Sequence, residues 1–439
     1  MSELSSFSQW LSDQLSDEEL LFRDPDLSRA QFRSLCRDAR RAVSLSQSES
    51  IALDFGDPVR FIAAFIACLS AGRTPALFTS HKVNYRRLKG NYGAVFTDKT
   101  DVPAEAEKIY WCFEAADLPI DKEDFSIPLD ASFDLYTSGS TSTPKRVTKT
   151  VRQMDLEAEY SLQLFKERIK GSELLASVER CHLFGLTFAL WLPALSGIPL
   201  HSKSVTFPDE LVRFTRPTSL ITSPTFLRNS EEGCAGSNFE FILTAGGPLS
   251  SLDITNGLRL CANGVHEIYG STETGLIASR HRLNPSQDQN WRLAPGLRLE
   301  QRGEDTTLFS PFVAKENFTL DDRIAMVSER EFTLLGRKDK AVKIGERRFS
   351  LEEIKQRTQE VTGLETVILM LENSHRKSAA AVVVSSKEHV DRSVRQWREK
   401  LRDSLEPLAI PRYWRSVEKI PVNAQGKMDT AALLELFDA

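Results

Sequence analysis

The sequence of 439 residues is poor in cysteine and has no strong excess of either charge. Its six cysteines are scattered, without a CxxC pair or metal-knuckle spacing, so a structural zinc site is not expected. The 56 basic and 61 acidic side chains leave a net charge of −5, too small to attract nucleic acid or a lipid surface. An anionic ligand must therefore bind at a local site.

Signals of secretion and of membrane insertion are also missing. The first residues, MSELSSFSQW, contain no basic segment followed by an apolar one, so no signal peptide is predicted. Leu183–Leu200 is free of charge and reaches the lower limit of membrane-spanning length, but Pro193, Gly197 and Pro199 interrupt it. We expect a buried core helix there and no membrane insertion. Scattered thiols suit a reducing compartment, so the expected location is cytoplasmic.

Short apolar runs alternate with helical patterns through most of the chain. Ser50–Phe55 predicts a strand, and Val59–Ala71 predicts an apolar helix that ends at Gly72. Further strands are predicted at Ala94–Thr97, Lys108–Phe113, Ser219–Pro224, Phe241–Ala245 and Glu267–Tyr269. This alternation predicts an α/β fold, with a large N-terminal domain of packed α/β sheets and helices over residues 1–338.

A different pattern begins in the charged stretch Gly336–Arg348. Ser350 and Glu353 have the spacing of a capping box, at the start of a helix that is expected to end at Gly363. The elements predicted next are strands at Glu365–Leu371 and Ala379–Ser385 and a helix near His389–Ser404. Residues 339–439 are therefore expected to form a small α+β domain.

The strongest local signal is Leu135–Lys145, LYTSGSTSTPK. The backbone N–H groups of such a loop form an anion nest, its hydroxyls donate to phosphate oxygens, and Lys145 adds positive charge. The segment lacks the G-x-x-x-x-G-K-[ST] pattern of P-loop proteins. From the residues alone, a phosphate-binding loop and a solvated loop both remain open.

Three further segments carry functional side chains. Glu267–Gly275, EIYGSTETG, sets Glu273 beside hydroxyls after an aromatic strand end, a combination suited to Mg²⁺ with phosphate, although a solvated turn is the alternative. Thr319–Arg323, TLDDR, offers an Asp for ribose hydroxyls. Pro421–Asp429 holds a lysine on a glycine-containing loop, where a solvated charge is the alternative.

These four segments, in this order, resemble the adenylate-forming superfamily of acyl-CoA synthetases, acid ligases, peptide-synthetase adenylation domains and firefly luciferase. The resemblance runs from about Ser50 to the end, and the order of the segments makes it specific. It implies a nucleotide site. Its residues would be Thr137, Ser138, Gly139, Ser140, Thr141 and Lys145 at the phosphates, Ala245, Gly246, Gly247, Tyr269 and Gly270 at the adenine, and Asp322 (or Asp321) with Arg337 at the ribose.

The resemblance also assigns the chemistry. Thr272 would contact the α-phosphate and Glu273 would hold Mg²⁺. Lys427 would be the catalytic lysine that bridges the carboxylate and the α-phosphate. His182 is similar to the family's histidine near the acyl pocket and thiol tunnel, although a lone histidine beside an apolar run is also often a core residue.

The sequence departs from the family pattern in three ways. Ser142 stands where the family usually has glycine in the phosphate loop, and Gly345 lies one position earlier than usual. The chain is also short, with the reduction in its N-terminal part. None of these differences removes a charged group that the chemistry needs.

The resemblance implies an ATP-dependent carboxylic acid–thiol ligase. The acid would be activated as acyl-AMP with Mg²⁺, and the acyl group would pass to CoA or to the phosphopantetheine of an acyl carrier protein after a rotation near Asp339 and Lys340. An aryl or a fatty acid would fit, and a weaker similarity points to ligases of aryl polyene pathways. Two alternatives stay open, an amino-acid-activating enzyme and a non-catalytic nucleotide-binding partner protein. The first is disfavoured because the amine of an amino acid needs an acidic partner. Phe188, Ala189 and Trp191 lie just beyond His182, with no acid nearby.

The lysine near the C-terminus gives a first prediction. Lys427→Ala should lower the rate of acyl-adenylate formation by about 10²-fold or more, because it removes the cation that would neutralise the negative charge that builds on the α-phosphate. Acid-dependent pyrophosphate exchange measures this step. An unchanged rate would contradict the role assigned to Lys427.

Overall fold

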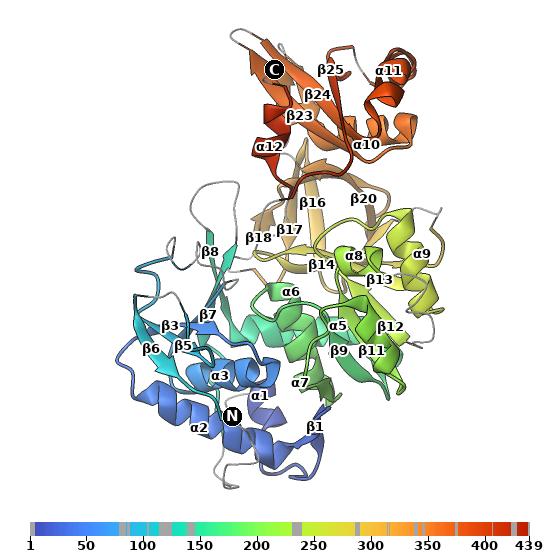
Figure 1. Ribbon diagram of the computed structural model, residues 1–439. Helices are drawn as coiled ribbons and strands as arrows, with labels where there is room; N and C mark the ends of the chain where they lie inside the picture. Colours follow the sequence, from blue (N-terminus) through green and yellow to red (C-terminus); the bar gives the residue numbers. More distant parts are fainter. Residues whose placement is uncertain are drawn as a thin grey trace. The chain divides into compact units, whose positions relative to one another are not determined.

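The structure, a computed structural model, describes residues 5–78, 85, 88–102, 105–113, 125–137, 145–230, 239–285, 290–313, 315, 317–337, 341–344, 347–373, 376–405, 407–422 and 428–437. Contacts divide the chain into two compact units (Figure 1), residues 1–299 with 308–318, and residues 300–307 with 319–439. The division thus falls earlier than position 338, and Asp322 and Arg337 belong to the second unit. The expected hinge at Asp339 and Lys340 lies outside the described residues and stays a prediction.

One sheet of the first unit has six strands, in the order β6-β5-β3-β4-β7-β8. Its inner strands are parallel, and β7 and β8 form an antiparallel pair at the edge. The predicted strands at residues 50–55 and 94–97 are confirmed, whereas the one predicted over Lys108–Phe113 ends at Tyr110. The strands are β3 (Ser50–Asp54), β4 (Thr74–Leu77), β5 (Ala94–Thr97), β6 (Glu107–Tyr110), β7 (Ser132–Thr137) and β8 (Lys145–Thr150).

The second sheet of this unit runs in the order β15-β14-β13-β12-β11-β9-β10-β1-β2. Strands β9, β11, β12 and β13 are parallel neighbours, so the loops after them gather along one edge of the sheet. The strands are β1 (Leu20–Arg23), β2 (Leu27–Ser28), β9 (Glu173–Ala176), β10 (Leu200–His201), β11 (Thr218–Thr222), β12 (Phe239–Thr244), β13 (Val265–Ser271), β14 (Gly275–Arg282) and β15 (Trp291–Leu293).

Several helices of the first unit begin at side-chain caps that the sequence supplies. Ser28 with Gln31 and Thr150 with Gln153 form capping boxes, and Asp57 caps a helix in which Val59 and residues 61–69 are apolar and buried. The helices are α1 (Ser6–Trp10), α2 (Arg29–Ser44), α3 (Pro58–Ser70), α5 (Val151–Ile169), α6 (Leu183–Leu186), η2 (Thr187–Trp191), α7 (Leu192–Ser196), η3 (Pro208–Arg213), α8 (Pro224–Arg228) and α9 (Ser251–Leu260).

Most of the uncharged run Leu183–Leu200 is helical and largely buried, as expected, but the helical part is divided among α6, η2 and α7, and Leu200 begins β10. Gly197 ends α7 in the left-handed region, with φ of 73°. Among the described residues, no helix is long and apolar enough to cross a membrane.

A cluster of aromatic rings around Trp191 joins the N-terminal part of the first unit to its centre. The ring of Trp191 lies 4.5 Å from Phe7, 5.6 Å from Phe65 and 5.8 Å from Phe133. Its indole N–H donates to the buried carboxylate of Asp155 at 2.9 Å. The run that contains Trp191 is thus part of the core.

The second unit contains a compact α+β layer, as predicted. Helices α10 and α11 pack on one face of the sheet β23-β24-β25 and α12 on the other (Figure 1), because both faces carry apolar side chains. Its elements, with the small sheet β16-β17-β18 at which the chain passes between the units, are β16 (Arg298–Arg302), β17 (Asp305–Phe309), β18 (Asn317–Thr319), β19 (Asp322–Met326), β20 (Glu331–Arg337), β21 (Ala341–Ile344), β22 (Arg347–Ser350), α10 (Leu351–Thr362), β23 (Thr366–Asn373), β24 (Arg376–Val384), α11 (Lys387–Leu401), β25 (Tyr413–Val417) and α12 (Thr430–Glu435).

His266 of β13 makes the stability of the first unit depend on pH. The buried ring stacks on His281 at 4.0 Å, and burial, together with the charges of His281 and Arg168, lowers the pKa of His266 to about 3. Because the folded pKa lies below the unfolded value, the contribution is complete above pH 6.5 and falls as the pH drops toward 3.

We therefore expect the free energy of unfolding to fall by about 2 kcal/mol from this group between pH 8 and pH 5. His266→Phe keeps an aromatic ring and should remove this part of the slope. Urea unfolding of both proteins at the two pH values measures it. Equal slopes would show that His266 does not titrate in this way.

Candidate active site

Strand β8 directs two lysines at a single glutamate. Lys145 and Lys149 lie four positions apart and so point to the same side of the strand. The ammonium of Lys145 contacts the carboxylate oxygen Oε1 of Glu273 at 2.5 Å. The ammonium of Lys149 donates to the main-chain carbonyl of Glu273 at 3.1 Å. Two of the four sequence segments, far apart in the chain, thus meet at Glu273.

Glu273 lies in the tight turn between β13 and β14. Burial raises the pKa of its carboxyl, but hydrogen bonds and the charge of Lys145 outweigh burial and hold this pKa below its usual value. The turn is closed by Ser271, whose N–H donates to the hydroxyl of Thr274 at 3.0 Å. Gly270 is required because a Cβ there would lie 2.2 Å from the carbonyl oxygen of Gly275. Thr272 is half-buried in the same turn.

Tyr269, predicted to stack on adenine, is half-buried near the end of β13. Its ring lies 5.7 Å from Trp291, and the guanidinium of Arg280 lies 4.3 Å from the same indole. Arg280 is fixed by two hydrogen bonds, of 2.8 and 2.9 Å, to the buried carboxylate of Glu267. A buried ion pair and an aromatic pair therefore hold the strand on which Tyr269 lies.

Ala245, Gly246 and Gly247 directly follow β12. Because β12 and β13 are parallel neighbours, this loop and the segment from Tyr269 lie at the same edge of the sheet. Gly246 has φ of 91°, a conformation that favours glycine. The structure thus brings the residues assigned to adenine to one sheet edge. Their binding role stays a prediction.

Asp322 and Arg337, assigned to the ribose, are direct partners on the antiparallel strands β19 and β20 of the second unit. Asp322 begins the strand, whereas Asp321 precedes it and is exposed. The register therefore favours Asp322 over Asp321 as the partner of Arg337.

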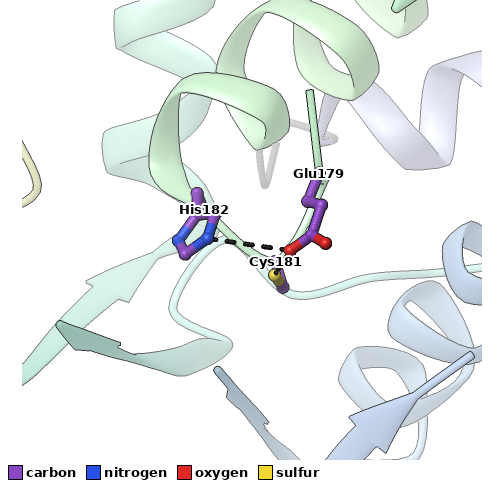
Figure 2. Close-up of side chains that lie close together, drawn as sticks. All are labelled: Glu179, Cys181 and His182. Carbon is purple, nitrogen blue, oxygen red and sulfur yellow. Dashed lines mark hydrogen bonds and ion pairs between the residues drawn. The ribbon is translucent and has the colours of Figure 1, made fainter. Parts of the chain in front are cut away.

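His182 lies at the start of α6 and its side chain is 55% exposed, so the alternative of a core histidine is wrong. Its Nε2 lies 3.8 Å from a carboxylate oxygen of Glu179, and the thiol of Cys181 donates to the same oxygen at 3.3 Å (Figure 2). Burial and this carboxylate raise the pKa of the Cys181 thiol, which keeps it protonated. The substrate role of His182 stays a prediction.

Several assigned residues lie outside the described residues. Thr137 ends β7 directly opposite Lys145, which fixes the two ends of the predicted phosphate loop. The assigned residues between these ends, and the lysine assigned to catalysis, are not described. They are Ser138, Gly139, Ser140, Thr141 and Lys427, and the unusual Ser142 and Gly345 are also outside.

Two polar residues beneath the turn were not predicted. Lys149 has 1% of its surface exposed and Glu157, on α5, has 2%. The alternation of Lys145 and Lys149 along one side of a strand could have indicated Lys149. Nothing in the local pattern of α5 distinguishes Glu157 from a solvated helix glutamate.

Comparison with known proteins gives the following matches. Residues 40–300 match the profile of a family described as AMP-binding enzyme. A 4-coumarate–CoA ligase from Rhodobacter capsulatus is 25% identical over 297 residues, 66% of this chain and 73% of that protein. Surfactin synthase subunit 1 from Bacillus subtilis is 23% identical over 96% of this chain, which spans 14% of that protein. The crystal structure of ATP-bound MatB from Rhodopseudomonas palustris matches with a TM-score of 0.77 at 18% identity, over 99% of both chains, and confirms the predicted fold.

Lys145 gives a prediction that separates binding from stability. Its ion pair is exposed on the lysine side, so Lys145→Met should change the free energy of unfolding by less than about 1 kcal/mol. If Lys145 binds a phosphate, the same change should weaken ATP binding by about 10- to 100-fold. Calorimetric titration and urea unfolding measure the two effects, and Lys166→Met, on exposed helix surface, is the control. Unchanged ATP affinity would contradict the assignment.

Proposed function

Because the chain belongs to the AMP-binding enzyme family, we propose that it is an ATP-dependent carboxylic acid–thiol ligase. It would activate an aryl or fatty acid as acyl-AMP and pass the acyl group to a thiol. The observation that carries the proposal is the contact between Lys145 and Glu273 at 2.5 Å. This contact joins a cation suited to phosphate and an anion suited to a divalent metal ion at one point of the first unit.

The donor chemistry of the turn fits Mg²⁺. The Glu273 carboxylate is a hard oxygen ligand, its pKa is held low, and Thr272 lies next to it in the same turn. Mg²⁺ would neutralise phosphate charge as pyrophosphate leaves. We assign Glu273 to that ion, with the remaining ligands supplied by phosphates and water.

The residues of the chain have separate tasks in this proposal. Lys145 would exchange Glu273 for a phosphate oxygen, which would leave the glutamate free to hold the metal ion. Tyr269, near the end of β13, would stack on the adenine ring, and Asp322 with Arg337 would hold the ribose. Lys427 would then bring a cation to the acid carboxylate and the α-phosphate as the oxygen–phosphorus bond forms.

A thiol is the proposed acceptor because the matched relative from Rhodobacter capsulatus is a CoA ligase. Both free CoA and the phosphopantetheine of an acyl carrier protein are compatible with the proposal. The weaker similarity to ligases of aryl polyene pathways would favour the carrier protein.

Amino-acid activation is the second candidate, because the chain also matches surfactin synthase subunit 1. Phe188, Ala189 and Trp191, which follow His182 with no acid nearby and so disfavour this candidate, are buried in the core. Substrate panels must decide between the two candidates.

The experiment is acid-dependent pyrophosphate exchange over a panel of aryl acids, fatty acids and amino acids. We expect exchange with an aryl or fatty acid, and release of acyl thioester when CoA or a phosphopantetheine-loaded carrier protein is added. Exchange with amino acids alone would favour the second candidate. Tight ATP binding without exchange, unchanged in Lys427→Ala, would favour a non-catalytic partner protein.

Glu273 gives a prediction about the metal ion. Glu273→Gln keeps the size of the side chain but removes its charge, so the rate of exchange at a fixed Mg²⁺ concentration should fall by about 10²-fold. Raising the Mg²⁺ concentration should recover part of the loss. A normal Mg²⁺ dependence in this variant would contradict the role of Glu273.

A further inference from the structure

The turn that carries Thr272 and Glu273 rests on two buried charged side chains. The ammonium of Lys149 donates to the main-chain carbonyl of Glu273 at 3.1 Å and to that of Phe312 at 2.8 Å. Burying an ammonium without a partner costs free energy, so a lysine in the core must be stabilised by the groups to which it donates hydrogen bonds. Both of these groups are main-chain carbonyls, one of them in the turn.

Glu157 holds the other end of the turn. Its Oε1 accepts from the main-chain N–H of Leu276 at 3.1 Å and from the hydroxyl of Thr187 at 3.3 Å. Its Oε2 is buried and has no hydrogen-bond partner among the described residues. This oxygen faces Gly275, where a Cβ would approach it to 2.5 Å. Gly275 also has φ of 68°, so the turn and the carboxyl group fit closely only with glycine at this position.

We propose that Lys149 and Glu157 are positioning residues that fix the backbone of the turn so that Thr272 and Glu273 face the nucleotide and its metal ion. The two lysines of β8 then act on Glu273 together. Lys145 meets its side chain and Lys149 its carbonyl, so the peptide that carries the carboxylate is fixed while the carboxylate stays able to exchange partners. This inference rests on the proposed function, and neither Lys149 nor Glu157 touches the substrate.

In this arrangement the acceptor atom of Glu157 matters more than its charge. Burial raises the pKa of Glu157 and lowers that of Lys149, although the charge of each opposes the shift of the other. Glu157→Gln keeps an oxygen for the Leu276 N–H, whereas Glu157→Met leaves that N–H without its partner. The first variant should therefore behave like the natural protein and the second should not.

The test compares Lys149→Met, Glu157→Met and Glu157→Gln with Thr187→Val as the matched control. Thr187 is fully buried and donates to the same oxygen of Glu157, but among the described residues it forms no hydrogen bond with the turn. Lys149→Met and Glu157→Met should raise the Mg²⁺ concentration for half-saturation, in binding of a non-hydrolysable ATP analogue, by about 10-fold. They should lower kcat of pyrophosphate exchange by about 10- to 100-fold, because the loss of a residue that orients a metal ligand has an effect of this size. The KM for the acid should be unchanged. Glu157→Gln and Thr187→Val should leave the Mg²⁺ dependence unchanged.

Folded Lys149→Met with normal Mg²⁺ dependence and kcat, or a Thr187→Val effect equal to that of Glu157→Met, would overturn the proposal. If the core variants do not fold, Gly275→Ala changes the turn without removing a buried group, and it should give the same Mg²⁺ shift. If the natural protein binds the Mg²⁺–analogue complex but shows no acid-dependent pyrophosphate exchange, the proposed function fails. The binding measurements alone then test whether Lys149 and Glu157 position the turn. Absence of that binding would overturn both.

Discussion

The structure around the candidate site depends on the contacts that strand β8 makes with Glu273. Strand β8 supplies a lysine to the carboxylate of Glu273 and another lysine to its carbonyl. The first contact is accessible to solvent, so a charged ligand is able to replace it at small cost. The second is buried, so breaking it would leave an ammonium without partners in the core. The chain thus combines a rigid backbone with an exchangeable side chain at the same residue.

This arrangement explains how a protein with a small net negative charge is suited to a strongly anionic ligand. Its 56 basic side chains are outnumbered by 61 acidic ones, so they produce no general positive field. Lys145 lies opposite Thr137 at the end of the predicted phosphate loop, so its position is set by the pairing of β7 with β8. Local placement of this kind would give the proposed site affinity for phosphate without general attraction to nucleic acids.

The candidate residues are divided between the two compact units. The lysines of β8, the turn with Glu273 and the loop at Ala245 belong to the first unit, whereas Asp322 and Arg337 belong to the second. Within the second unit, antiparallel pairing sets Asp322 opposite Arg337 without help from the first. The strand pairing within each unit thus sets the positions of that unit's own candidate residues.

The sequence by itself determined the α/β class, several of the strands, and the order of the segments that contain Lys145, Glu273 and Asp322. These features are local, since they depend on apolar periodicity, capping residues and the chemistry of short loops. Tertiary structure alone decided that His182 is exposed and that Lys149 and Glu157 support the turn. A buried lysine and a buried glutamate resemble solvated ones in a sequence, because their partners in the turn lie more than a hundred positions away and are selected by sheet register and packing.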